Sequence, residues 1–329
     1  MTESREDLKS TEIQRNLEEV VPPRLVHAAP GPSHRELMSL STPQLHRFLA
    51  GLAADWIPIV LAMVLARQIN HWAAYAFAAV VIGTRQHAIG ILGHDGAHRL
   101  ASRRRWLNKA VTQLFCFWPI GADMNAYRHF HFPHHKFLNT PRDPEMAYRL
   151  LGAPEWDVPC DRRGLVVRFL KDMIGLGTFE AFRVLYSIRP TKLSELAGPV
   201  LTLAAAVAVT ALTGTLWVLI LWYAAFFTAF VAVWRLRCWI EHVGTDDTHR
   251  LHVGLVVAWI LAPHNVYMHW EHHKWPAIPY WNLPRARARD SSVPVQSFWE
   301  LLRYYGRCRP VTSGEPTLDE SGRSLLSSS

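Results

Sequence analysis

The sequence predicts an all-α, integral membrane fold with four transmembrane helices in two hairpins. Hydrophobic residues make up 50% of the 329 residues, and they gather in long runs of Ala, Val, Leu and Trp that carry almost no charge. Runs of this kind suit helices that face lipid. The uneven distribution of Lys and Arg between the runs then indicates how the helices are oriented.

The first predicted hairpin lies in the first third of the chain. One apolar run covers residues 48–65, and a second covers 72–83 and continues as a mixed segment to residue 93. The link at 66–71 is so short that the two helices must be antiparallel neighbours. The chain is therefore expected to cross the bilayer and return.

The second predicted hairpin lies in the second half of the chain. Its runs at 196–212 and 216–233, joined by residues 213–215, are each close to the ~17–25 residues that span a bilayer. Two further apolar runs, at 110–120 and 254–262, are too short to span. They are expected to form helices that lie at the membrane surface.

The basic residues orient the predicted helices. The link at 66–71 carries one basic residue and 213–215 carries none, whereas residues 93–195 carry sixteen Lys or Arg and residues 235–329 carry eleven. By the positive-inside rule, the central segment and both termini lie in the cytosol. The sequence therefore predicts a multi-pass membrane protein, located in the bacterial inner membrane.

Composition divides the chain into three parts. Residues 1–46 are predicted to form an N-terminal cytosolic arm that is partly disordered, residues 47–310 the membrane domain, and residues 311–329 a disordered C-terminal tail rich in Ser and other polar residues. No apolar region of a secretory signal precedes the first run.

Charge and cysteine content exclude two other classes of protein. The formal net charge is +8, but Lys and Arg flank the apolar runs instead of alternating with aromatic residues, so no nucleic-acid binding is expected. The four cysteines are widely scattered and show no CxxC spacing. They predict neither a disulfide framework nor a thiolate metal site.

Nine of the 18 histidines fall into short motifs that follow the apolar runs. On a helix, residues i, i+3 and i+4 share one face, with Cβ atoms ~5–6 Å apart, so HxxxH and HxxHH spacing directs two or three imidazoles toward one point. Pro133 lies inside one motif, so that helix is expected to be kinked or to begin there. The nine residues are His94, His98, His131, His134, His135, His242, His269, His272 and His273.

Histidines at this spacing predict a site for two metal ions. At this histidine content, chance would produce HxxHH in roughly one window in six thousand, and the chain contains the motif twice. Nine imidazoles exceed the places of one zinc site, and imidazole binds Zn, Cu, Fe and Ni alike. Ligating histidines usually donate their second N–H to a carboxylate, and the candidates beside the motifs are Asp95, Asp143, Glu145, Glu241 and Glu271.

Four segments, taken in order, carry a family resemblance. They are HDGAH at 94–98, YRHFHFPHH at 127–135 followed by Asn139 and Asp143-Pro-Glu, then Arg237-Cys-Trp-Ile-Glu-His242, and HWEHHKWPAIPYWNLP at 269–284. Over residues 85–285 the chain resembles the membrane fatty acid desaturase and hydroxylase superfamily. The resemblance implies a cytosolic helical cap that holds a histidine-rich di-metal site, with two non-haem irons and O₂ as co-substrate. It also implies that all nine histidines are iron ligands.

Two departures from the family pattern concern the second iron and the source of electrons. Stearoyl-type desaturases have an asparagine, placed to hold a metal-bound water, where this chain has Cys238. The chain contains no HPGG motif of a cytochrome b5, no flavin or nicotinamide fingerprint and no CxxC pair. Electrons are therefore expected from an external ferredoxin, rubredoxin or cytochrome b5-type donor. The basic residues between Arg99 and Lys109 either dock that donor or anchor the second helix.

The resemblance implies an O₂-dependent oxidoreductase that desaturates an aliphatic, fatty acyl or lipid-like substrate. A hydroxylase or ketolase that uses the same site on a lipid or specialised metabolite stays open, because no spacing separates alkene from alcohol formation. A histidine-rich membrane metal transporter is the alternative from another class. Transport sites lie near the middle of the bilayer, whereas these motifs follow the apolar runs, which favours the enzyme.

Overall fold

The structure is a computed structural model that describes residues 32–145, 162–242, 245 and 247–305. The predicted arm before residue 32 and the predicted tail at 311–329 lie outside the described residues. Within them the fold is helical, apart from two short strands, β1 (Leu251–His252) and β2 (Gln296–Ser297), that pair in parallel. Four helices of this part are long and apolar enough to cross a membrane, as the sequence predicted.

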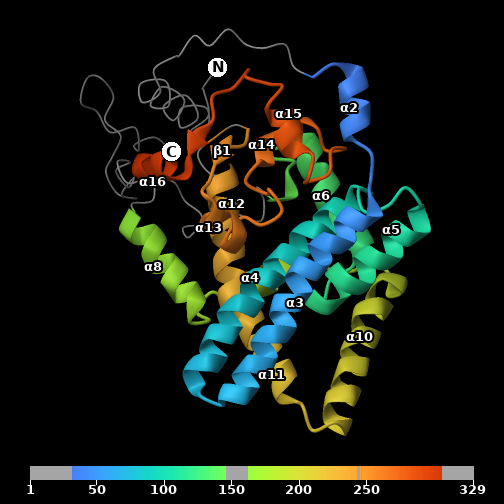
Figure 1. The fold of residues 1–329 in the computed structure, drawn as a ribbon, viewed down its shortest axis with the longest axis vertical. Helices are drawn as coiled ribbons and strands as arrows, with labels where there is room; N and C mark the ends of the chain where they lie inside the picture. Colours follow the sequence, from blue (N-terminus) through green and yellow to red (C-terminus); the bar gives the residue numbers. More distant parts are fainter. Residues whose placement is uncertain (1–31, 146–161, 243–244, 246, 306–329) are drawn as a thin grey trace, which may run out of the picture.

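The first hairpin consists of α3 (Leu45–Ile69) and α4 (Trp72–Ala97), which lie side by side (Figure 1). Asn70 closes the turn in a left-handed conformation with a φ of 49°, and its N–H donates to the carbonyl of Ala66. α4 extends beyond the predicted segment that ended at residue 93, and its last turns carry the first histidine motif. These turns can be helical without being apolar because they are buried in protein instead of facing lipid.

The second hairpin consists of α10 (Leu193–Leu212) and a helix that continues from Trp217 to His242. The latter comprises α11 (Trp217–Ala225), the π-helical turn η3 (Phe226–Phe230) and α12 (Val231–His242). The π-helical turn packs so closely against α4 that a Cβ on Gly83 would lie 2.6 Å from the Cβ of Ala229. The helix extends past the predicted end of the run at residue 233, so His242 lies on the spanning helix itself.

The two short apolar runs also form helices. The first includes the end of α5 (Arg105–Thr112), the π-helical η1 (Gln113–Phe117) and the 3₁₀-helical η2 (Trp118–Ile120), and the second includes α13 (Leu255–Ile260). Several of their large apolar side chains are exposed, among them Leu114 and Leu255, while others such as Phe117 are buried. Exposed apolar side chains on short helices suit a position at the membrane surface.

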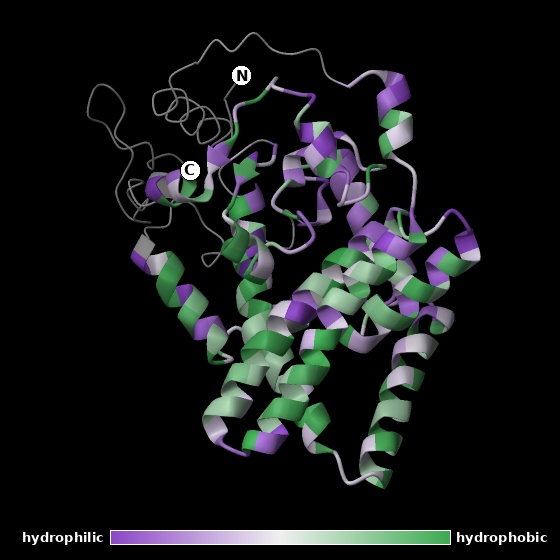
Figure 2. Cartoon of the chain, viewed as in Figure 1, coloured by the Kyte–Doolittle hydropathy of each residue, from purple (hydrophilic) through white to green (hydrophobic). Residues whose placement is uncertain are grey.

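A polar cap covers one end of the spanning helices. Figure 2 shows apolar residues along the lower parts of α3, α4, α10 and α11 and polar residues at the opposite end. At that end lie α2 (His34–Leu40), α5, α6 (Met124–Phe137), α14 (His269–Lys274) and α15 (Leu283–Arg287). We call these five helices the polar cap. The other described helices are α8 (Arg162–Met173), α9 (Thr178–Ser187) and α16 (Phe298–Tyr305).

Candidate metal centre

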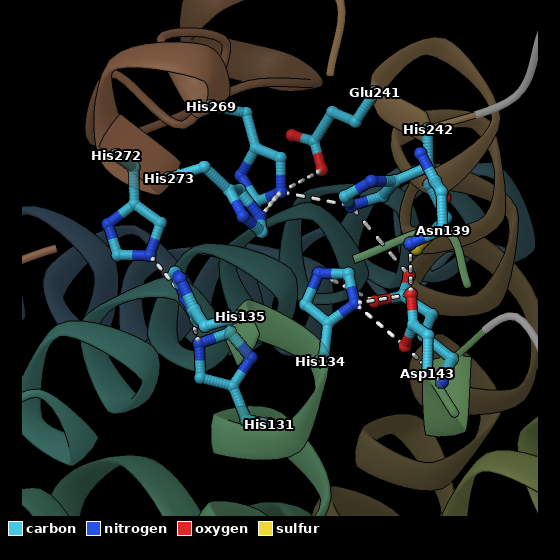
Figure 3. A network of polar contacts seen from close by, with 12 residues as sticks. His131, His134, His135, Asn139, Asp143, Glu241, His242, His269, His272 and His273 are labelled. Atoms are coloured by element: carbon cyan, nitrogen blue, oxygen red, sulfur yellow. Dashed lines mark hydrogen bonds and ion pairs between the residues drawn. The ribbon is translucent and has the colours of Figure 1, made fainter. Parts of the chain in front are cut away.

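The nine histidines of the predicted site lie together, at the ends of α4 and α12 and along α6 and α14. Figure 3 shows those of α6, α12 and α14. The nine histidines form two groups, and within each group the facing ring nitrogens all lie within 4.8 Å of one another. The first group is His94, His98, His131, His135 and His272, and the second is His134, His242, His269 and His273.

Helix α6 begins well before its histidine motif. Asp123 caps the helix by accepting hydrogen bonds from the backbone N–H groups of Asn125 and Ala126. Pro133 therefore lies inside the helix, and the expectation that a helix begins at Pro133 is wrong. Because the motif is helical, His131 and His135 share a face, with their Nε2 atoms 2.9 Å apart.

The nitrogens of the first group have the spacing of metal ligands. The Nε2 atom of His131 lies 2.9 Å from the Nε2 atoms of both His98 and His135, and His135 Nε2 lies 3.0 Å from that of His272. One ring nitrogen carries either one N–H or one in-plane lone pair and so forms one linear hydrogen bond. His131 and His135 each have two such neighbours, so these contacts are not explained by hydrogen bonds alone. Two donors at right angles, each ~2.1 Å from a metal, would lie about 3.0 Å apart, which matches these distances.

The second group repeats the pattern. His269 Nε2 lies 2.9 Å from His242 Nε2 and 3.0 Å from His273 Nε2. His269 Nε2 has two neighbours, but one ring nitrogen forms only one linear hydrogen bond. The residues present therefore fit two metal ions, each facing imidazole nitrogens of one group.

Asp143 orients one histidine of the second group. Both of its carboxylate oxygens lie 3.0 Å from His134 Nδ1, which leaves Nε2 to face the other imidazoles. Burial would raise the pKa of Asp143, but the hydrogen bonds from His134 and from backbone N–H groups hold the pKa below its usual value. A carboxylate that fixes the ring and the tautomer in this way is typical of metal-binding histidines.

The other predicted carboxylates have different partners. Asp95 Oδ1 lies 3.6 Å from His94 Nδ1, too far for a hydrogen bond, and Asp95 Oδ2 accepts from the backbone N–H of Tyr280. Glu241 Oε2 accepts a hydrogen bond from Arg237 Nη1 at 2.6 Å. The same oxygen lies 3.7 Å from His269 Nε2, the nitrogen that faces the other imidazoles of the second group.

Glu271 holds α14 in place through two arginines. Arg250 Nε donates to Oε1 at 2.6 Å, and Arg287 donates to both oxygens at 2.7 Å. The Glu271 carboxylate is fully buried. Sequence reasoning missed both arginines, because they lie outside the motifs and no spacing relates them to Glu271.

Tyr127 is a further neighbour that the motifs did not single out. Its ring stacks on His131 with centroids 5.0 Å apart and meets His94 edge to face at 6.5 Å. Tyr127 precedes His131 by four residues on α6, so the i, i+4 rule could have placed it beside the site.

Burial sets the protonation state of the histidines. Burial and the neighbouring imidazoles lower the pKa of His98 to about 3, and they lower that of His135 to about 4. Burial also lowers the pKa of His131, His269 and His272 well below the usual value. The rings are therefore neutral at physiological pH, the form in which imidazole binds a metal.

Comparison with known proteins agrees with this site. The fatty acid desaturase family matches residues 70–301, a segment that contains all nine histidines. A dihydrorhizobitoxine desaturase of Bradyrhizobium elkanii is 26% identical over 259 residues, which cover 72% of this chain and 73% of that protein. Desaturases are oxidoreductases, and the family match extends over most of the chain. The resemblance that the motifs indicated is thus confirmed, and the chain belongs to the fatty acid desaturase family.

Proposed function

We propose that the chain is an O₂-dependent oxidase with two non-haem irons held by the nine histidines, and that it desaturates an aliphatic, fatty acyl or lipid-like substrate. The observation that supports this most directly is the pair of histidine groups with Nε2 atoms 2.9–3.0 Å apart. When bound, the irons supply the activation of O₂ and the removal of hydrogen from an unactivated C–H bond. The relative from B. elkanii is named a desaturase, which favours desaturation over hydroxylation.

The protein's own contribution is to hold and orient the ligands. Asp143 fixes the ring of His134, and the two arginines on Glu271 fix the helix that carries His269, His272 and His273. Partners of this kind affect metal affinity and activity by ~10–100-fold. Because five of the nine histidines are buried and the other four are half-buried, the imidazoles are held in place before a metal binds.

We place the approach of the substrate along the C-terminal half of α4. Gly90 lies about one turn before His94 on the same helical face, and a Cβ on Gly90 would meet no atom within 4 Å. His87 lies a further turn into the apolar region, and it is buried without a hydrogen-bond partner for either ring nitrogen among the described residues. An aliphatic chain beside Gly90 would pass close to His94, with His87 available to a polar group of the substrate.

We propose that the polar cap and both termini face the cytosol of a bacterial inner membrane. Reporter fusions at Asn70 and Gly214, the turns of the two hairpins, should be external, and a fusion at Arg163 should be internal. An external reporter at Arg163 would contradict this topology.

We propose that an acidic electron donor of the ferredoxin, rubredoxin or cytochrome b5 type docks on the basic segment from Arg99 to Lys109, which joins α4 to α5 and includes the start of α5. The side chains of Arg99, Arg103, Arg104, Arg105 and Lys109 are exposed there. Complementary charge mainly accelerates such encounters and is screened within about 8–10 Å at physiological salt. The segment directly follows the helix that carries His94 and His98, so a donor bound there would be near the proposed irons.

Product analysis tests the proposed function. The protein is expressed in iron-supplemented cells, and membranes are supplied with a ferredoxin, its reductase and acyl substrates of several chain lengths. Mass spectrometry should detect a product that has lost H₂, only in the presence of O₂, and not with the His134→Ala variant. A product that gains oxygen would identify a hydroxylase, and iron-loaded protein that shows no O₂-dependent turnover of any aliphatic substrate would reject the proposal.

A further inference from the structure

We propose that Glu145 is a carboxylate ligand of the second metal, the one that faces His134, His242, His269 and His273. The inference deepens the proposed function and depends on it, because it requires a metal ion at the second group. Sequence reasoning considered Glu145 as an acceptor for the outer N–H of a histidine. Its position in the structure is on the inner side.

The backbone around Glu145 is tied to the site. Asn139 reverses the chain after α6 with a φ of 52°, and its side chain donates to the carbonyl groups of Thr245 and Asp247. The N–H of Glu145 donates to Asp143 Oδ1 at 2.8 Å. The Asp143 carboxylate thus orients the ring of His134 on one side and fixes the backbone of Glu145 on the other.

The carboxylate of Glu145 approaches the nitrogens that face the metal position. Its Oε2 lies 3.4 Å from His134 Nε2, and its Oε1 lies 4.0 Å from His242 Nε2. Donors ~2.1 Å from an octahedral metal lie about 3.0 Å apart at right angles and about 4.2 Å apart when opposite. Both measured distances fall within that range. No single oxygen of Glu145 lies within 4.8 Å of all four facing nitrogens, so binding of the metal would require a rotation of the Glu145 side chain. The 3.4 Å separation also exceeds the ~2.7–3.2 Å of an N–H···O hydrogen bond.

The tautomer of His134 strengthens the argument. Its Nδ1 donates to Asp143, so in the neutral ring Nε2 carries a lone pair. A carboxylate oxygen facing a lone pair is repelled unless a cation lies between them. A metal ion at the second group would turn this repulsion into two bonds to the same ion.

Glu241 is the competing carboxylate, and it fits less well. The oxygen that lies 3.7 Å from His269 Nε2 is the same Oε2 that accepts a hydrogen bond from Arg237 at 2.6 Å. The guanidinium therefore competes with a metal for that oxygen. With Glu145 the second metal would have five protein donors, as many as the five histidines of the first group, and one of them would be an anion.

Metal titration of the purified full-length protein in detergent tests the assignment. Bound metal is first removed with a chelator, and Co²⁺ is then titrated in competition with a chromophoric chelator, with the absorption spectrum of bound Co²⁺ as a second readout. Wild type should bind two Co²⁺ per chain. Glu145→Gln should leave the first affinity unchanged and weaken the second at least tenfold. Glu300→Gln, the same change at an exposed helix cap, is the matched control and should resemble wild type.

Chemical rescue separates a ligand from a supporting residue. In Glu145→Ala, formate should restore the second Co²⁺ affinity and its spectrum, because a small carboxylate can occupy the place of the missing side chain. Failure of formate to restore a weakened second site, or an equal loss at both sites, would reject Glu145 as a ligand. A second affinity in Glu145→Gln equal to that of wild type would also reject it, and the proposed di-metal function would stand. Fewer than two Co²⁺ bound by wild type would instead contradict the proposed function itself.

Discussion

Replacing Asp55 by leucine is expected to destabilise the protein by about 3 kcal/mol, the lower end of the ~3–5 kcal/mol that is lost when one partner of a buried ion pair is removed. Asp55 on α3 and Arg85 on α4 are almost fully buried, with Oδ1 and Nη1 3.3 Å apart. Without Asp55, Arg85 still donates to the carbonyl of Trp259 and lies 4.3 Å from the centre of its ring. Because Arg85 keeps these contacts, the expected loss of stability lies at the lower end of the ~3–5 kcal/mol range. His264 also loses its acceptor, because its Nε2 lies 2.7 Å from Asp55 Oδ2.

Thermal unfolding in detergent, followed by circular dichroism, measures this loss. A change of ~3 kcal/mol should lower Tm by about 6–12 °C, since ~1 kcal/mol shifts a domain of ~150–250 residues by ~2–4 °C. The double variant Asp55→Leu, Arg85→Leu removes both charges and should melt above Asp55→Leu alone. The reasoning is refuted if Asp55→Leu melts like wild type, or if the double variant melts below the single one.

Three further predictions follow from the site and the cap. Asp143→Asn should weaken the second metal by ~10–100-fold in chelator competition, and an unchanged affinity would show that the His134 tautomer does not depend on Asp143. The folded pKa values of His98 (about 3) and His135 (about 4) lie below that of an unfolded histidine, ~6.5. The contribution of these two neutral histidines to the stability of the metal-free protein should therefore be fully present above about pH 6.5 and decrease as the pH falls toward 4. Equal Tm values at pH 7 and pH 5 would contradict this prediction. Replacing the three arginines at 103–105 by glutamine should slow reduction by an acidic donor and flatten its salt dependence, whereas unchanged rates would place the donor elsewhere.

The spanning helices were predictable from the sequence, but their ends were not. Apolar runs mark the part of a helix that faces lipid, and the structure contains a long helix for each predicted run. The runs end where the residues become polar, yet α4 continues to Ala97 and α12 to His242. At those ends α4 packs against α5 and α6, and α12 packs against α8. A helix that packs against protein has no need of an apolar surface that faces lipid.

The residues that support the site were predictable only where they are local. Asp143 lies in a motif segment close to His134, so proximity in sequence suggested its contact. Arg250 and Arg287 reach Glu271 through the packing of the chain around α14, and no sequence pattern relates them. The inner position of Glu145 depends on the left-handed turn at Asn139, which a motif of residue types does not encode.

The distribution of the histidines between the two groups follows from helix geometry. Neighbouring residues of an α-helix point ~100° apart, because a turn contains ~3.6 residues, whereas residues i and i+4 share a face. His131 and His135 accordingly belong to the first group, and His134, between them, belongs to the second.

The same division holds for the other HxxHH motif with the groups exchanged. His269 and His273 belong to the second group, and His272 belongs to the first. Each HxxHH motif therefore contributes its i, i+4 pair to one histidine group and its middle histidine to the other. A rotation of α6 or α14 would displace histidines of both groups at once, and with them proposed ligands of both metals. Asp143 contacts His134 on α6, and Glu271 fixes α14 through Arg250 and Arg287. Losing either carboxylate is therefore expected to affect more than one proposed ligand.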